Sequence, residues 1–171
     1  MAVSLTLHEL NLAALAPEIL LMLGICVFLV VEALTGRKEC PRRADRMALL
    51  VLVAPLVAVL WQYSHGPQQA FGHMYLADDL AYLLKVCGIV CTGSIIIYSR
   101  GYMADRGIRG ADLYVLALFS LLGQMVMISG GNLLVLYLGL ELMSLSLYAA
   151  IGLRRDWMKG TEAAMKYFVL G

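Results

Sequence analysis

The sequence predicts an all-α membrane protein, a polytopic bundle with about five complete transmembrane helices and the start of a sixth. Hydrophobic residues make up 61% of the chain, whereas a soluble domain is nearer half apolar. They gather in runs of about 20, the length that a helix needs to cross a bilayer. Lysine and arginine gather in alternate loops between the runs. The net charge of +1 does not indicate a basic surface for nucleic-acid binding. We therefore expect the chain to lie in the lipid bilayer.

Residues 12–34 form the first predicted span. Pro17 falls in its first turns, where proline is tolerated. Glu18 and Glu32 lie near its opposite ends, where their carboxylates can reach the lipid headgroups. The N-terminus lacks the basic segment and cleavage site of a signal peptide, so we expect this run to remain as a span.

The second span covers residues 47–64, with a kink expected at Pro55. The third covers residues 80–98 and follows two aspartates. It contains Lys85 about two turns from its start. We expect this long side chain to extend toward the acidic end of the helix and to place its ammonium in water.

The fourth span covers residues 113–129, and the apolar run 130–153 forms the fifth. The Ser-Gly-Gly-Asn sequence at 129–132 predicts a tight turn, so these two spans form an antiparallel hairpin. A sixth helix is expected from Thr161, a plausible N-cap. Its run to the last residue gives only about 16 Å of helix, against the roughly 30 Å that a bilayer needs. We therefore expect the chain to be part of a longer protein.

The positions of lysine and arginine predict the orientation in the membrane. Basic residues lie between the first and second spans, the third and fourth, and the fifth and sixth, at 37–46, 100–109 and 154–159. Such loops remain on the cytoplasmic side. The N-terminus is therefore predicted to be periplasmic.

Glu141 is the most informative residue, because it lies near the middle of the fifth apolar run. A carboxylate at that depth is costly and is by default a sign of function. Tyr137, Ser144 and Tyr148 are spaced three or four residues from one another or from Glu141, so they share one helix face with it. Their hydroxyls can orient the acid or its water. We interpret this face as a proton-transfer site, with a protonated glutamate that bonds neighbouring helices as the alternative.

Lys166 lies about five residues into the sixth helix, and Glu162 precedes it by four. One interpretation is a surface ion pair at this helical spacing. The other is a buried lysine that exchanges a proton with Glu141 through water, since lysine readily changes its charge state when buried. The two side chains differ in depth by roughly 10 Å, so a direct salt bridge is not expected.

Neither the cysteines nor the histidines indicate a metal or haem site. Cys87 and Cys91 share a helix face, but no other ligand has zinc-site spacing. We interpret the cysteines in the apolar runs as small core residues. The histidines lie outside the runs, where a haem between helices could not be bound. The full set is Cys26, Cys40, Cys87, Cys91, His8, His65 and His73.

The fifth run, GNLLVLYLGLELMSLSLYAAIGL, is followed by RRDWMKGTEAAMKYFVLG. With its midspan glutamate, its short basic loop and the Glu-Ala-x-x-Lys-Tyr-Phe that opens the next helix, this region resembles the subunit N family of bacterial NADH-quinone oxidoreductase (respiratory complex I). DLYVLALFSLLGQMVMISGGN resembles the preceding helix of that family. The resemblance covers essentially the whole chain and is strongest over 112–171.

The resemblance implies an antiporter-like fold of about fourteen helices, with two inverted five-helix repeats. Residues 1–111 would then be three leading helices, and 112–171 the start of the first repeat, truncated in its third helix. Glu141 would be the proton-transfer glutamate and Lys166 the lysine that opens the sixth helix. The family's later lysines and its broken seventh helix do not occur in this sequence.

The function implied is that of a membrane-arm subunit in the bacterial inner membrane, taking part in proton translocation coupled to electron transfer from NADH to quinone. Other membrane subunits of complex I, including neighbouring antiporter-like subunits, would be its partners. The sequence has no flavin, iron–sulfur or NADH motif, so we expect no cofactor in this chain and redox chemistry in other subunits. Two alternatives remain, a subunit of a multi-subunit cation/proton antiporter and a non-catalytic membrane scaffold.

Overall fold

The computed structural model describes residues 11–35, 41–72, 74–106, 110–153 and 158–170, which form helices and one short β-hairpin. The predicted fold class is confirmed, because nearly all of the described segments are helical, and five of the described helices are long and apolar enough to cross a membrane. In chain order the elements are α1 (Ala16–Thr35), α2 (Pro41–Tyr63), β1 (Gln68–Ala70), β2 (Tyr75–Ala77), α3 (Asp79–Arg106), α4 (Gly110–Ile128), α5 (Leu133–Ile151) and α6 (Met158–Leu170).

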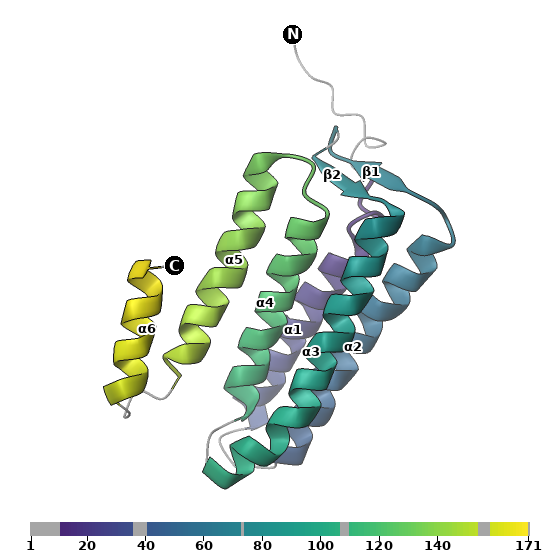
Figure 1. Cartoon of the computed structure of the whole chain (residues 1–171). Helices are drawn as coiled ribbons and strands as arrows, with labels where there is room; N and C mark the ends of the chain where they lie inside the picture. Colours follow the sequence, from purple (N-terminus) through teal and green to yellow (C-terminus); the bar gives the residue numbers. More distant parts are fainter. Residues whose placement is uncertain (1–10, 36–40, 73, 107–109, 154–157, 171) are drawn as a thin grey trace.

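Helices α1 to α4 form a bundle, α5 packs along α4, and α6 packs on α5 at the edge of the molecule (Figure 1). The β-hairpin and the α4–α5 turn lie at one end, which we call the hairpin end. At the other end lie the last turns of α1, α3 and α5 and the first turns of α2, α4 and α6 (Figure 1). These turns flank the three basic loops of the sequence, so the helix ends next to those loops lie at a single end.

The bundle core follows the helical period. In α1, the side chains of Leu21, Ile25 and Phe28 are fully buried, and they are spaced four and three residues apart on one face. Leu118 and Met125 of α4 are likewise fully buried. In α1 the residues between these positions are largely exposed apolar side chains, as expected for a surface that meets lipid, whereas the residues between Leu118 and Met125 of α4 are buried or half-buried.

The β-hairpin is a feature that the sequence reading did not include. Its antiparallel strands pair Gln68 with Ala77 and Ala70 with Tyr75. Tyr75 also pairs with Gly130 in the α4–α5 turn, where the Leu76 N–H donates to the Ser129 carbonyl at 2.9 Å. These bonds tie the turn before α5 to the segment that enters α3.

Several helix ends differ from the predictions. Helix α1 begins at Ala16 after a turn, and α3 continues past the predicted span to Arg106. The N-cap predicted at Thr161 is wrong, because α6 begins at Met158 and Thr161 lies inside it. The physical reason is local: methionine and lysine form helix readily, so the first turn forms upstream of the threonine.

Helices α4 and α5 approach closely because glycine is present on both sides of the contact. A Cβ atom added at Gly123 would lie 2.6 Å from the backbone nitrogen of Met143, and one added at Gly139 would lie 2.8 Å from the Gly123 carbonyl oxygen. Small residues permit this approach of helix backbones in membranes. The pairing of the two helices confirms the predicted hairpin of the fourth and fifth spans.

The cysteines are not the core residues that the sequence suggested. Cys26, Cys87 and Cys91 are all exposed on the outside of the helices, while Cys40 lies outside the described residues. The prediction failed because in a membrane protein the outward face is as apolar as the core, so hydrophobicity alone does not distinguish the two.

Candidate functional site

Glu141 lies near the middle of α5, as the sequence predicted. The helix begins after Asn132, whose side chain accepts a hydrogen bond from the Leu134 N–H at 3.5 Å. From Leu133 to Glu141 the helix rises about 12 Å. Glu141 is half-buried, and Tyr137, one turn earlier, is 60% exposed and interacts with its carboxylate. The first part of the predicted hydroxyl face is thus present around the acid.

The second part of that face has different contacts. Ser144 is half-buried one turn beyond Glu141. The ring of Tyr148 packs against α6, with ring centroids 5.1 Å from Tyr167 and 5.4 Å from Phe168, both in edge-to-face geometry. Such pairs stabilise contacts between helices. Tyr148 therefore joins α5 to α6, and we place it outside the immediate surroundings of the acid.

Lys166 forms an ion pair on the surface of α6. Its ammonium lies 2.6 Å from a carboxylate oxygen of Glu162, and the two side chains are 68% and 61% exposed. Of the carboxylates that the structure describes, Glu162 pairs with Lys166 and Glu141 does not. This geometry agrees with the depth argument against a direct Glu141–Lys166 bridge, and it favours the surface-pair interpretation within the described residues.

A second ionisable cluster lies at the hairpin end, and the sequence reading missed it. The ammonium of Lys85 is fully buried and lies 2.7 Å from a carboxylate oxygen of Glu18. It also donates to the Tyr75 hydroxyl at 2.8 Å, while that hydroxyl is 3.0 Å from both carboxylate oxygens of Glu18. The predictions that Lys85 extends into water and that Glu18 reaches the headgroups are therefore wrong. Each side chain has an opposite charge within reach, which compensates for burial.

Tyr75 holds this cluster together. Its hydroxyl lies 3.0 Å from the carbonyl oxygen of Ala14, and its ring lies 5.0 Å from the Lys85 ammonium. Burial raises the pKa of the Tyr75 phenol, and the nearby Glu18 carboxylate raises it further, so the phenol stays protonated. The buried Ser129 hydroxyl faces this phenol but completes no hydrogen bond within the described part of the chain.

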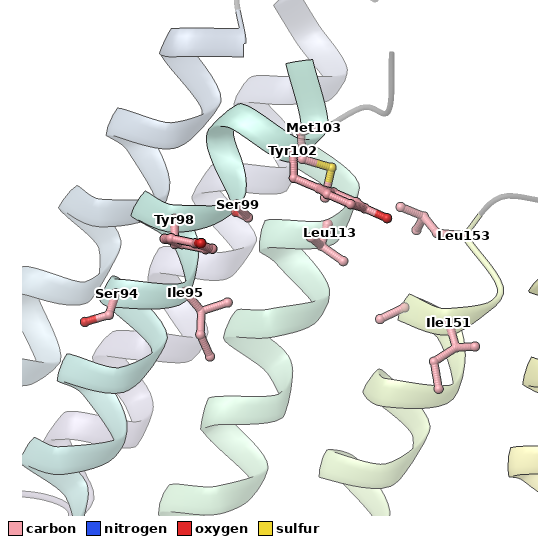
Figure 2. A pocket seen from close by; sticks show the side chains of 10 residues that line it. Ser94, Ile95, Tyr98, Ser99, Tyr102, Met103, Leu113, Ile151 and Leu153 are labelled. Carbon is pink, nitrogen blue, oxygen red and sulfur yellow. The ribbon is translucent and has the colours of Figure 1, made fainter. Parts of the chain in front are cut away.

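A cavity of about 710 Å³ opens between α3, α4 and α5 at the end away from the hairpin (Figure 2). Figure 2 shows the side chains of Tyr98 and Tyr102 on α3 facing this space, with Ile151 across it on α5. The lining is mostly apolar, with hydroxyl groups but no carboxylate or amine. The described lining therefore carries no charged side chain, and we keep it apart from the Glu141 site.

A comparison with known protein families matches the segment of the chain that contains α5 and α6. Residues 130–171 match the family model described as NADH:quinone oxidoreductase/Mrp antiporter, transmembrane region. This segment contains Glu141, Lys166 and the three hydroxyl residues predicted from the sequence.

Curated relatives match almost the whole chain. NADH-quinone oxidoreductase subunit N of Paraburkholderia phymatum is 44% identical over 166 residues, covering 94% of this chain and 33% of the relative. Its counterpart in Herminiimonas arsenicoxydans is 43% identical over 171 residues, covering 96% of this chain and 34% of the relative. The chain thus spans about one third of the length of these relatives.

Among solved structures, respiratory complex I from Thermus thermophilus with bound aureothin contains a similar chain. It has a TM-score of 0.69 and 26% identity, covering 90% of this chain and 32% of that one. The fold is thus that of an antiporter-like membrane protein, similar to a chain of respiratory complex I. Within that class, nearly the whole chain is similar to NADH-quinone oxidoreductase subunit N.

Proposed function

We propose that this chain is part of a membrane-arm subunit of a proton-pumping NADH-quinone oxidoreductase. In this role Glu141 receives and releases a proton during translocation coupled to electron transfer from NADH to quinone. The observation that carries the proposal is a half-buried carboxylate near the middle of a membrane-spanning helix, inside the segment that matches the antiporter family. Such an acid is costly in lipid and is expected to have a function.

In this proposal each side chain near Glu141 has its own role, and the roles become less direct with distance from the carboxylate. Tyr137 interacts with the carboxylate and orients it or its water. Ser144 supports the same function from the next turn, while Tyr148 acts indirectly by fixing α5 against α6. Lys166 tunes the charge state of Glu141 at a distance, and its pairing with Glu162 makes that influence small.

The partners and the location follow from the family. We propose that the protein lies in the bacterial inner membrane beside other membrane subunits of complex I, including neighbouring antiporter-like subunits. The hairpin end would face the periplasm and the basic loops the cytoplasm. Flavin, iron–sulfur clusters, NADH and quinone would bind to other subunits, because no sequence motif for them occurs here.

The test replaces Glu141 by glutamine in the full-length subunit within the assembled complex. We expect quinone-linked proton pumping to fall strongly, because the amide cannot take up a proton, while Glu141→Asp retains part of it. Glu32→Gln is the matched control, since it removes a half-buried carboxylate near the end of α1. Wild-type pumping by a fully assembled Glu141→Gln complex would leave only the scaffold interpretation.

A second candidate is a subunit of a multi-subunit cation/proton antiporter. The description of the matching family model includes Mrp antiporters, which favours this possibility for residues 130–171. The curated relatives are named as oxidoreductase subunits over nearly the whole chain, which favours the first candidate. Proton pumping that requires NADH and quinone distinguishes the two, because an antiporter would exchange ions without them.

A further inference from the structure

The cavity between α3, α4 and α5 extends from the membrane surface into the apolar part of the helices. Its α3 wall includes residues from Ser94 to Met103, which is about 13 Å of helix. The apolar span of α3 ends at Met103, so this residue marks the outer end of the cavity. Figure 2 shows Tyr102 and Leu153 at the outer end and Ser94 and Ile95 at the inner end. The cavity thus covers the depths of both a headgroup and an acyl chain.

The serines of the α3 wall make their hydrogen bonds within the helix. The Ser94 hydroxyl donates to the Val90 carbonyl at 2.9 Å, and the Ser99 hydroxyl donates to the Ile96 carbonyl at 3.0 Å. Neither hydroxyl proton is therefore directed at a ligand. Together with the apolar side chains of the lining, this leaves an inner surface that suits hydrocarbon.

The outer end of the cavity has the features of a membrane–water interface. Tyr98 and Tyr102 are 91% and 54% exposed, and tyrosines near the end of a span typically lie at headgroup level. All but two of the 13 lysines and arginines lie in segments 37–46, 100–109 and 154–159, with only four of the 12 acids. The described helix ends that flank these segments lie at this end of the molecule (Figure 1). The outer end therefore lies in a positive electrostatic field.

The size of the cavity distinguishes a lipid chain from a further helix. A helix with its side chains is about 10–12 Å across, so a 13 Å length of it would occupy roughly 1,000–1,500 Å³. The cavity has about 710 Å³, which is too small for that segment but is in the range of small-molecule sites. A narrow hydrocarbon chain is thus the occupant that agrees with both the volume and the apolar lining.

We propose that this cavity binds an anionic phospholipid. One acyl chain lies against Ile95, Leu113 and Ile151, and the headgroup lies at the level of Tyr102, next to the basic end of the molecule. Basic regions between transmembrane helices bind anionic headgroups in this way. The cavity has no part in the Glu141 site, so this inference and the proposed function can each fail alone.

The experiment uses phosphatidylglycerol with a photoreactive diazirine on one acyl chain, added to bilayers that contain the full-length subunit in its assembled complex. After illumination, mass spectrometry locates the labelled residues. We expect labelling of the α3 and α5 walls of the cavity. A phosphatidylcholine probe at the same mole fraction should label them about fivefold less, the ratio that one basic residue near the membrane surface provides.

Two tryptophan variants on α3 test the position. Ile95→Trp fills the cavity and should reduce its labelling at least about fivefold, because the indole takes the place of the chain. Ile97→Trp is the matched control, since Ile97 is two positions away, does not line the cavity and is as exposed as Ile95, at 55% against 59%. Its labelling should equal that of the wild type. Ile151→Trp repeats the test from α5, should Ile95→Trp fail to assemble.

Three outcomes would overturn the proposal. Equal labelling in Ile95→Trp and Ile97→Trp would show that the probe reports only the surrounding bilayer. Equal labelling by the two probes would show that the site does not select an anionic headgroup. Unlabelled cavity walls in the wild type would show that another segment covers the cavity in the assembled complex.

Discussion

Two lysine–glutamate ion pairs in the described residues differ in their exposure to solvent. Lys85 and Glu18 are buried between helices, whereas Lys166 and Glu162 are both more than half exposed on α6. An exposed pair contributes about 0–1 kcal/mol, because water and salt screen it. Removing one member of a buried pair typically costs about 3–5 kcal/mol, since the remaining charge lacks a partner.

Lys85→Met is therefore expected to lower the free energy of unfolding by about 3–5 kcal/mol. The double variant Glu18→Gln/Lys85→Met should regain much of that loss, because no unpaired charge remains. Lys166→Met is the control and should change stability by less than about 1 kcal/mol. Thermal unfolding in matched detergent measures all three. Equal stability of the single and double variants at the buried pair would contradict the assignment.

At Lys166, we predict a smaller effect on pumping than at Glu141. Lys166→Ala should impair proton translocation less than Glu141→Gln, because the ammonium is exposed and bound to Glu162. A charge roughly 10 Å away changes the free energy of ionisation of a carboxyl group by only about 1–2 kcal/mol, before screening by water. Pumping by the assembled complex at several salt concentrations measures this influence. A loss equal to that of Glu141→Gln would assign Lys166 a direct part in the transfer.

The residues of the candidate site differ in how well the sequence predicts them. Glu141 could be predicted because the position of an acid in the middle of one apolar run is visible from the sequence of that run alone. The environment of Lys85 could not be read in that way, because its partner is 67 positions earlier and its link to Glu18 depends on Tyr75 in a hairpin. A useful signal was nevertheless present. Glu18 and Lys85 are opposite charges near the same membrane face in spans one and three.

At the scale of elements, the apolar runs predict the five spanning helices because lipid imposes length and composition on each. The β-hairpin carries no comparable constraint, since it lies outside the spans and is only three residues long on each side. Its position is fixed by contacts with the α4–α5 turn. Such distant contacts cannot be inferred from local periodicity, which explains why this element was missed.

The α4–α5 contact gives a prediction for glycine. Gly139→Val should separate the two helices, because its Cβ would meet the Gly123 carbonyl oxygen at 2.8 Å, which is backbone and cannot move aside. Overpacking of this kind costs about 1–3 kcal/mol or more. Gly101→Val is a matched control, since no atom lies within 4 Å of an added Cβ there. Thermal unfolding that is equally affected by both variants would contradict the close approach.

The turn before α5 provides a milder prediction. Asn132→Ala removes the side chain that caps the helix and should cost about 0.5–2 kcal/mol. Asn132→Ser should retain most of the stability, because serine is a comparable cap. The loss should appear as faster amide hydrogen exchange in the first turn of α5. Equal exchange in the alanine and serine variants would show that the cap contributes little.

At the scale of the whole molecule, the topology explains the charge distribution of the sequence. Alternate loops of the sequence are basic, and the described helix ends that flank those loops lie at the end opposite the hairpin (Figure 1). The hairpin end has a different composition, with exposed Asp78 and Asp79. This polarity is the reason to expect a single orientation, since lysine and arginine near the ends of spans remain on the cytoplasmic side.

The corresponding prediction is that the hairpin end faces the periplasm. In a full-length protein whose native cysteines have been replaced, Gln69→Cys and Arg43→Cys place one thiol at each end, both at exposed positions. A membrane-impermeant thiol reagent added to intact cells should label the first and not the second. After the cells are opened, both should react. Labelling of Arg43→Cys in intact cells would reverse the orientation, and the Glu18–Tyr75–Lys85 cluster would then lie on the cytoplasmic side.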